Sequence, residues 1–487
     1  MRRPAIPAQR RANLKSLALL ICGAVSLLLG CTPIKQIRTI PTPAEPNHPI
    51  TYLPAPVLSD VCDTGRPTEG ENRNTFEDYG SYVLAFAEFD DQGWSYSSDA
   101  QIRAIQTRLE SELNDSQYNE FDYSVMVFVH GWHHNAHDND CNVQEARQMV
   151  KLASESFDGA YKSHVWKRQR RVFGIYVGWR GESIDAAGLR YVTAIDRRDT
   201  AEKVAKGSVR QLFANLHELQ LAAKAAAGTV LGRSSHVDDG SGSSDASRRM
   251  YTTVVGHSFG GLIVFNSLSQ QMTNDLTAAL QSNALMGCSE YKAVGAAVPD
   301  PARNWPDEVI LINPAFEASR FETMNRLADR SAACGYQGGI PLLTVVTADD
   351  DFWTGPAFAA ARRLLTLFEG YDRSSRLAHA EEEESNLHAI GFVSRYRTHR
   401  LCVRESPGGN YATVSLTPAL GRGSKDLAAR PVWVVGAPPD IVYGHNGFLY
   451  ARSRHGRPLP YLLDWLIDRH LNPNRAIAEP GSCGRWP

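Results

Sequence analysis

The sequence predicts an α/β protein with a mostly parallel central sheet and helices on both faces. Short apolar segments with strand character alternate with longer segments of helical periodicity along almost the whole chain, a pattern typical of parallel sheets. One segment, 124–129, is continuously apolar, as expected for a strand buried on both faces. Hydrophobic residues make up 43% of the 487 residues, which is enough to build a large core.

The predicted elements follow one another in a regular order. Helical segments carry apolar residues at spacings of three and four, as with Ile102, Ile105 and Leu109 on one face of the first helix. The last element is a helix that would close the domain. Strands are predicted at 82–89, 124–129, 171–179, 251–255, 308–313, 342–347 and 432–436, and helices at 98–113, 142–157, 199–226, 261–280 and 461–471.

Charge excludes one class of function. The chain carries 51 basic and 53 acidic side chains, which gives a formal net charge of −2. A protein dedicated to nucleic acid or to acidic lipid needs a large basic excess. We therefore expect no nucleic-acid partner.

The N-terminus, 1–30, has the features of an export signal. A basic stretch precedes the apolar run 17–29, which is too short to span a bilayer comfortably. The run ends in Leu-Leu-Gly-Cys, which resembles the cleavage site of bacterial lipoproteins. That resemblance implies a diacylglycerol on Cys31 and, because Thr32 is not aspartate, an outer-membrane protein facing the periplasm. An ordinary signal peptide or an uncleaved anchor is the alternative.

The mature chain divides into three parts. Residues 31–80 are rich in Pro, Thr and Asn and are interpreted as a tether with an irregular lead-in. Residues 81–475 form the α/β domain, in which the Ser-, Gly- and Asp-rich segment 233–249 is a surface loop. Residues 476–487 form a tail. Export to an oxidising compartment predicts disulfides among the six remaining cysteines, with no pairing specified: Cys62, Cys141, Cys288, Cys334, Cys402 and Cys483.

The most informative motif is Gly256-His257-Ser258-Phe259-Gly260, which follows the strand 251–255 directly and leads into a helix. A serine at such a sharp turn presents its hydroxyl above the carboxyl edge of the sheet. Small residues on either side allow the strand and the helix to approach each other. The helix N-terminus supplies positive potential where an oxyanion would form. An inert serine in a glycine-rich turn is the alternative.

This arrangement resembles the nucleophile elbow of the α/β-hydrolase superfamily, whose triad appears in the order Ser, acid, His. The resemblance implies Ser258 as nucleophile. The His130-Gly131 pair after strand 124–129 resembles the oxyanion loop of that family. The backbone N–H groups of Trp132 and Phe259 would then bind the oxyanion, with His130 in a structural role.

The same order indicates the acid and the base. Strand 342–347 is followed by three aspartates, of which Asp351 fits best, with Asp349 and Asp350 as alternates. The glycine-flanked His445 follows the final strand and is the expected general base. His455 in an arginine-rich segment is its competitor.

The segment that contains the predicted oxyanion loop can alternatively be interpreted as a metal site. Histidine, aspartate and cysteine residues are dense there, and two of the histidines would share a face if the segment were helical. The strand followed by His-Gly favours the oxyanion interpretation, so we expect no metal. The residues in question are His130, His133, His134, His137, Asp138, Asp140 and Cys141.

A long segment, 356–430, separates the acid from the histidine. It contains the apolar-basic helix 357–368 and an acidic run, 381–384. Insertions at such places often cap the active site; peripheral decoration is the alternative.

The sequence thus predicts a lipid-anchored serine hydrolase that cleaves small-molecule or lipid carboxylic esters without a cofactor. A non-catalytic envelope scaffold on the same fold is the alternative from another functional class.

Overall fold

The structure is a computed structural model. It describes residues 35–40, 73–115, 121–166, 168–181, 194–231, 250–284, 305–333, 340–371, 375–405, 412–419, 430–449, 462–463 and 465–467. The export signal, Cys31, loop 233–249, His455 and the tail 476–487 lie outside these ranges. In the described part of the chain, no helix combines the length and the apolar character needed to cross a membrane.

A ten-stranded sheet forms the centre of the molecule, with strand order β1-β2-β4-β3-β5-β6-β7-β10-β8-β9. Only the outermost pairs, β1–β2 and β8–β9, are antiparallel. The predicted α/β class with a mostly parallel sheet is therefore confirmed. The strands are β1 (Phe76–Asp78), β2 (Tyr82–Glu88), β3 (Phe121–Val129), β4 (Gln169–Gly178), β5 (Met250–His257), β6 (Glu308–Ile312), β7 (Leu343–Ala348), β8 (His399–Glu405), β9 (Ala412–Pro418) and β10 (Val432–Ala437).

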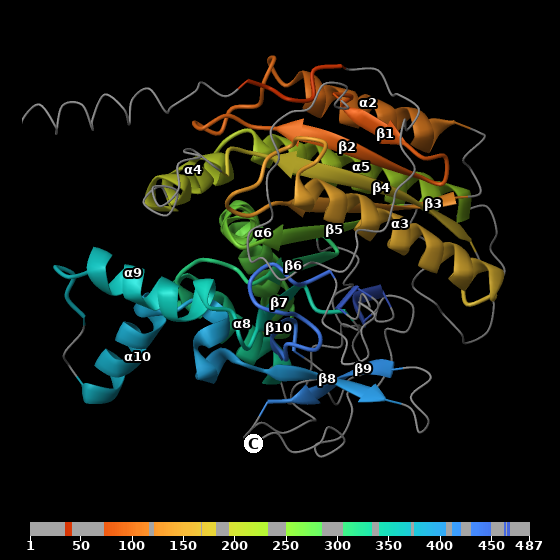
Figure 1. Cartoon of the computed structure of the whole chain (residues 1–487). Helices are drawn as coiled ribbons and strands as arrows, with labels where there is room; N and C mark the ends of the chain where they lie inside the picture. The colour runs from red at the N-terminus through yellow and green to blue at the C-terminus, as the bar shows by residue number, and fades with distance from the viewer. Residues whose placement is uncertain are drawn as a thin grey trace, which may run out of the picture.

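Helices cover both faces of the sheet (Figure 1). Helices α2, α4, α5, α6 and α8 pack on one face, and α3 packs on the other with residues 462–463 and 465–467. Side chains of the strands and of these helices form two extended apolar clusters, one on each face of the sheet, which accounts for the continuously apolar residues 125–129 of β3. The helices are α2 (Ala100–Asn114), α3 (Cys141–Lys162), α4 (Ala194–Lys206), α5 (Val209–Leu231), α6 (Phe259–Ala284), α8 (Glu322–Ala333), α9 (Phe358–Leu365) and α10 (Arg376–Leu387), with short turns of helix at Ala318–Phe321, Trp353–Ala357, Ile390–Phe392 and Ser394–Tyr396.

The predicted single helix 199–226 is wrong, because the structure has two helices there, α4 and α5. The break lies at Gly207, which packs so closely on the backbone of Gly93 that a Cβ at Gly207 would overlap the Gly93 carbonyl. The Ser208 N–H donates to the same carbonyl, at 2.8 Å. This contact joins residues far apart in the sequence, so the helical periodicity could not reveal it.

The segment 356–430 has two kinds of structure. Its first part forms α9 and α10, which stand out from the rest of the molecule (Figure 1). Its later part forms β8 and β9, and β8 pairs in parallel with β10 at the edge of the sheet. The segment therefore extends the sheet as well as adding helices.

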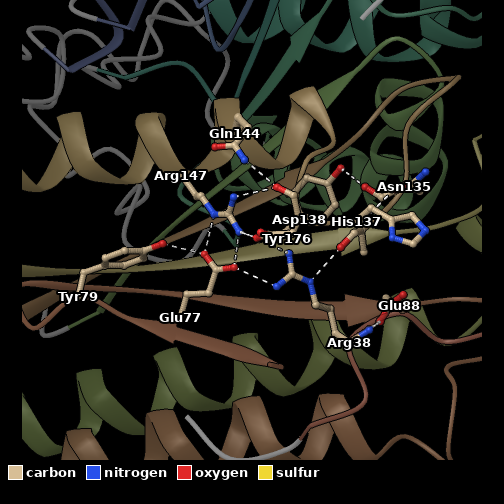
Figure 2. Close-up of polar contacts among 11 residues, drawn as sticks. Arg38, Glu77, Tyr79, Glu88, Asn135, His137, Asp138, Gln144, Arg147 and Tyr176 are labelled. Carbon is tan, nitrogen blue, oxygen red and sulfur yellow. Dashed lines mark hydrogen bonds and ion pairs between the residues drawn. The ribbon is translucent and has the colours of Figure 1, made fainter. Parts of the chain in front are cut away.

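A buried ion-pair network fastens residues 35–40 to the sheet (Figure 2). Arg38 is fully buried, and its guanidinium donates to Glu77 at 3.0 Å and to the Ala136 carbonyl at 2.9 Å. Its backbone N–H donates to the Glu88 carboxylate at 2.8 Å. Arg147 from α3 donates twice to the same Glu77 carboxylate, at 2.7 and 2.6 Å. The network thus ties the N-terminal segment to β1, β2 and α3.

Candidate active site

The nucleophile candidate lies at a strained turn between a strand and a helix. Strand β5 ends at His257, Ser258 has a φ of 55°, and α6 begins at Phe259. A left-handed backbone is unfavourable for a serine, so neighbouring bonds must hold it. The Ser258 N–H donates to the Ile312 carbonyl at 3.0 Å, and the Ala315 N–H donates to the Ser258 carbonyl at 3.1 Å. These contacts tie the turn to β6 and the residues that follow it.

Close packing around the turn requires glycine. A Cβ on Gly256 would lie 2.7 Å from the Gly260 carbonyl oxygen, and one on Gly131 would lie 2.9 Å from the Ser258 Cβ. A Cβ on Gly260 would overlap the Val129 carbonyl at the end of β3. Strand β3, strand β5 and helix α6 therefore meet at one point, directly beside the serine.

Ser258, His445 and Asp351 form a hydrogen-bonded chain. His445 Nε2 lies 2.8 Å from Ser258 Oγ, and His445 Nδ1 lies 2.8 Å from Asp351 Oδ2. Because a carboxylate can only accept, Nδ1 carries the proton and Nε2 accepts from the serine hydroxyl. The structure thus brings together the three residues that the sequence assigned separately to a nucleophile, a base and an acid.

The three adjacent aspartates after β7 have different partners. Asp351 is buried against His445. Asp350 accepts the Gly444 N–H at 2.9 Å. Asp349 is ion-paired with Arg397 and Arg400, at 2.9 and 2.6 Å. The like charges are separated by these partners, and Asp351 is the one of the three that contacts the histidine.

The environment of Asp351 favours its charged form. Burial alone would raise the pKa of this carboxyl, but the adjacent His445 and several hydrogen bonds outweigh burial and lower the pKa below its usual value. The donors are the N–H groups of Trp353 at 2.9 Å and Thr354 at 3.3 Å, together with the Thr354 hydroxyl. Asp351 is therefore held ionised and oriented toward the histidine.

The loop that carries His445 is held by two residues that the sequence did not indicate as positioning groups. The Asn313 side chain donates to the carbonyls of Gly444 and His445, at 3.0 and 2.8 Å, and accepts the Ala348 N–H at 2.8 Å. His257 Nε2 lies 2.9 Å from the same His445 carbonyl. Asn313 follows β6 directly, and a polar residue just after a buried strand is the feature of the sequence that could have indicated its role. Its partners lie in distant segments, so the sequence could not identify them.

The predicted oxyanion residues lie beside the nucleophile. Trp132 follows Gly131, where an added Cβ would lie 2.9 Å from the Ser258 Cβ, and Phe259 is the first residue of α6. The rings of Trp132 and Phe259 have centroids 6.4 Å apart. The N–H groups at the start of a helix have no intrahelical acceptor, so Phe259 is suited to bind an anion.

His130 has a structural environment. It is fully buried and stacks on Trp179, whose backbone N–H donates to His130 Nε2 at 3.0 Å, while His130 Nδ1 contacts the Gly131 carbonyl at 2.8 Å. Burial lowers the pKa of His130 to about 4, so the ring is neutral at neutral pH. This ring supports the backbone of the predicted oxyanion loop.

The other members of the histidine-rich segment have separate partners. His134 Nδ1 lies 3.1 Å from Asp140, which caps α3. Cys141 is disulfide-bonded, as is Cys402, and Asp138 pairs with Arg147. Among the residues that the structure describes, no three histidine, cysteine, aspartate or glutamate side chains are grouped to hold a metal ion. The metal interpretation therefore has no supporting ligand set in this segment.

No protein-family model matches the chain, and no curated protein matches it. Among solved structures, phospholipase PlaB from Legionella pneumophila in complex with thio-NAD aligns with 72% of this chain at 12% sequence identity and a TM-score of 0.24. The alignment spans 58% of the length of PlaB.

Proposed function

We propose that this protein is a serine hydrolase that cleaves carboxylic esters through an acyl-enzyme intermediate. The observation that carries the proposal is the chain Ser258–His445–Asp351, joined by two contacts of 2.8 Å. A serine activated by a histidine, which is in turn oriented by a buried carboxylate, is the recurring arrangement for acyl transfer.

The geometry supports a two-step mechanism. Ser258 Oγ attacks the ester carbonyl while His445 Nε2 takes the hydroxyl proton, and Asp351 stabilises the resulting imidazolium. The backbone N–H groups of Trp132 and Phe259 would bind the oxyanion of the tetrahedral intermediate. His445 then gives its proton to the leaving alcohol. A water molecule, activated by the same histidine, releases the acid and restores the free serine.

The wider architecture supports an α/β-hydrolase fold. The nucleophile lies on a tight turn from strand to helix, and the acid and the histidine follow it in that order along the chain. Each of the three stands just after a parallel strand: β5, β7 and β10. Their side chains therefore meet at the carboxyl edge of the sheet.

We also propose that Cys31 carries a lipid anchor and that the protein faces the periplasm from the outer membrane. The Leu-Leu-Gly-Cys sequence at 28–31 supports this. Mass spectrometry of the mature N-terminal peptide should detect an acylated cysteine. An unmodified Cys31, or a retained residue 1–30 segment, would contradict it.

A fluorophosphonate probe tests the hydrolase proposal. The wild-type chain should be labelled, and Ser258→Ala should not be. Ser267→Ala is the matched control, because Ser267 lies in α6, the helix that follows Ser258, and donates to the backbone carbonyls of Ile263 and Ala205; it should be labelled like the wild type. Equal labelling of Ser258→Ala, or no labelling of the wild type, would refute the proposal. A series of p-nitrophenyl esters of increasing acyl length would then define the preferred substrate.

A further inference from the structure

The end of helix α9 exposes a group of large apolar side chains. Phe368 is fully exposed, and Leu364 and Leu367 are 70% and 66% exposed. Residues 358–368 contain two arginines and no acidic residue. An exposed cluster of this kind is unusual on a soluble surface and marks a site of contact. We call it the apolar tip, defined by Leu364, Leu365, Leu367, Phe368 and, from the start of α10, Leu377.

Helix α9 is firmly attached at its inner face. Arg362 is ion-paired with the buried Glu317 at 2.8 Å and donates to the Asn386 carbonyl of α10 at 3.1 Å. Ala359 and Thr366, on the same side of the helix, are buried. The outward orientation of the apolar tip is therefore fixed by packing and ion pairing.

The apolar tip lies on the same side of the molecule as the carboxyl edge of the sheet, where the triad is located. Helix α9 begins soon after Asp351, and α9 and α10 project on the side to which the parallel strands point (Figure 1). Phe352 is 59% exposed, and the Trp353 ring lies 6.4 Å from that of Trp132, beside the nucleophile. Phe352 and Trp353 thus lie along the chain between the acid of the triad and the start of α9.

The N-terminal segment is fastened to the same edge at the far end of the sheet. Arg38 contacts Glu88, the last residue of β2, and Ala136, which follows β3. Trp94, which is 70% exposed, precedes Ser97 by three residues, and Ser97 donates to the side chain of Gln36 in this segment at 2.8 Å. Lys35 is the first described residue of this segment, and Cys31 lies shortly before it in the sequence. A fully extended chain between the two spans about 14 Å at most. A lipid on Cys31 would keep this edge close to the bilayer.

We propose that the carboxyl edge of the sheet faces a lipid bilayer, with the apolar tip inserted into its surface, and that the substrate is an ester of a membrane lipid. The substrate part rests on the proposed hydrolase function, whereas the orientation does not. Leucine and phenylalanine next to an exposed arginine, here Arg363, are typical of helices that lie in a membrane interface. Residues 35–40 and the apolar tip lie toward opposite ends of this edge, so the proposed lipid on Cys31 and the inserted tip would hold the triad between them.

Photo-cross-linking tests the orientation without reference to activity. The full chain carrying Phe368→p-benzoylphenylalanine is reconstituted in phosphatidylcholine–phosphatidylethanolamine vesicles and irradiated. Val165 is the matched control position, because it is 54% exposed and lies between α3 and β4, at the opposite edge of the sheet. Position 368 should form lipid adducts at least about tenfold more often than position 165.

Equal adduct yields at the two positions, or a cross-link from position 368 to protein rather than lipid, would overturn the orientation. Neither result depends on whether the chain hydrolyses esters, so a failed orientation is distinguishable from a failed hydrolase proposal.

Paired substrates test the substrate class. The variant Leu364→Ser/Leu367→Ser/Phe368→Ser should hydrolyse p-nitrophenyl butyrate within about twofold of the wild type, but vesicle phospholipid at least about tenfold more slowly. Val165→Ser should match the wild type on both. Unchanged phospholipid hydrolysis by the triple variant, or wild-type activity on the soluble ester alone, would overturn the lipid-ester assignment. If the wild type hydrolyses neither p-nitrophenyl butyrate nor phospholipid, the hydrolase function is refuted. The orientation at the membrane is then decided by the cross-linking result alone.

Discussion

At the scale of single residues, each of the three adjacent aspartates has different hydrogen-bond or ion-pair partners and therefore a different environment. Asp351 is buried against His445, whereas Asp349 and Asp350 bind arginines and a backbone N–H. The sequence favoured Asp351 from its distance beyond the strand but left the other two open. Arg397 and Arg400 pair with Asp349, and the Gly444 N–H donates to Asp350; all three partners lie far along the chain, so the sequence could not assign them.

Replacing these aspartates singly should separate their roles. Asp351→Asn should lower kcat for a p-nitrophenyl ester by about 10³- to 10⁴-fold, because an amide can hold the histidine in the wrong tautomer. Asp350→Asn is the control, since an amide oxygen can still accept the Gly444 N–H, and its kcat should remain within about threefold of the wild type. Steady-state kinetics checks both. Full activity of Asp351→Asn would exclude it as the acid.

Asn313 should act as a positioning residue for the histidine loop. Asn313→Ala removes two hydrogen bonds to the Gly444 and His445 carbonyls, so the imidazole should move relative to Ser258. A displacement of about 1 Å is expected to lower kcat by about 10²-fold with KM little changed. Kinetics should be accompanied by a thermal unfolding curve. A loss of stability with unchanged kcat would indicate a purely structural role.

His130 should make stability depend on pH. Its pKa is lowered by burial to about 4 in the folded chain, against 6.5 when unfolded. Between these values the unfolded state binds more protons, so stability falls as pH falls through 6.5. From pH 7 to 5, His130 should cost about 2 kcal/mol of unfolding free energy. Urea denaturation at both pH values should show a correspondingly smaller change for His130→Gln; an identical change would contradict this.

At the scale of helices and strands, local periodicity predicted most elements, and tertiary contacts decided the exceptions. Strand β8 pairs with β10, and this pairing is a relation between segments that periodicity does not encode. The break between α4 and α5 likewise depends on Gly93, more than a hundred residues before Gly207. The elbow was predictable because strand, turn and helix are contiguous there.

Two glycine variants test the origin of the helix break. Gly207→Ala should destabilise the protein by about 1–3 kcal/mol, because the added methyl group would overlap the backbone of Gly93. Gly159→Ala in α3 is the matched control. A Cβ there has open space, so this variant should be about 0.5–1 kcal/mol more stable than the wild type. Chemical denaturation measures both. Destabilisation of the two variants alike would contradict the packing explanation.

At the scale of the whole molecule, the parallel sheet gathers residues from distant parts of the sequence at one edge. Ser258, Asp351 and His445 could each be predicted because each follows its own strand, and the carboxyl ends of parallel strands meet. The second layer of contacts, from Asn313 and Arg397, could not be predicted because it joins loop to loop. The buried contacts of Arg38 with Glu77 and Ala136 also lie near this edge. They could not be predicted, because the Pro- and Thr-rich composition around Arg38 indicated an irregular tether.

The most direct test of the central claim is to trap the acyl group on the enzyme. The chain is mixed with p-nitrophenyl butyrate, quenched in acid within one turnover, digested and analysed by mass spectrometry. We predict a butyryl group on the peptide containing Ser258, formed together with one equivalent of p-nitrophenol, and neither in Ser258→Ala. Turnover of the ester with Ser258 unmodified, or a butyryl group on another residue instead, would contradict the account.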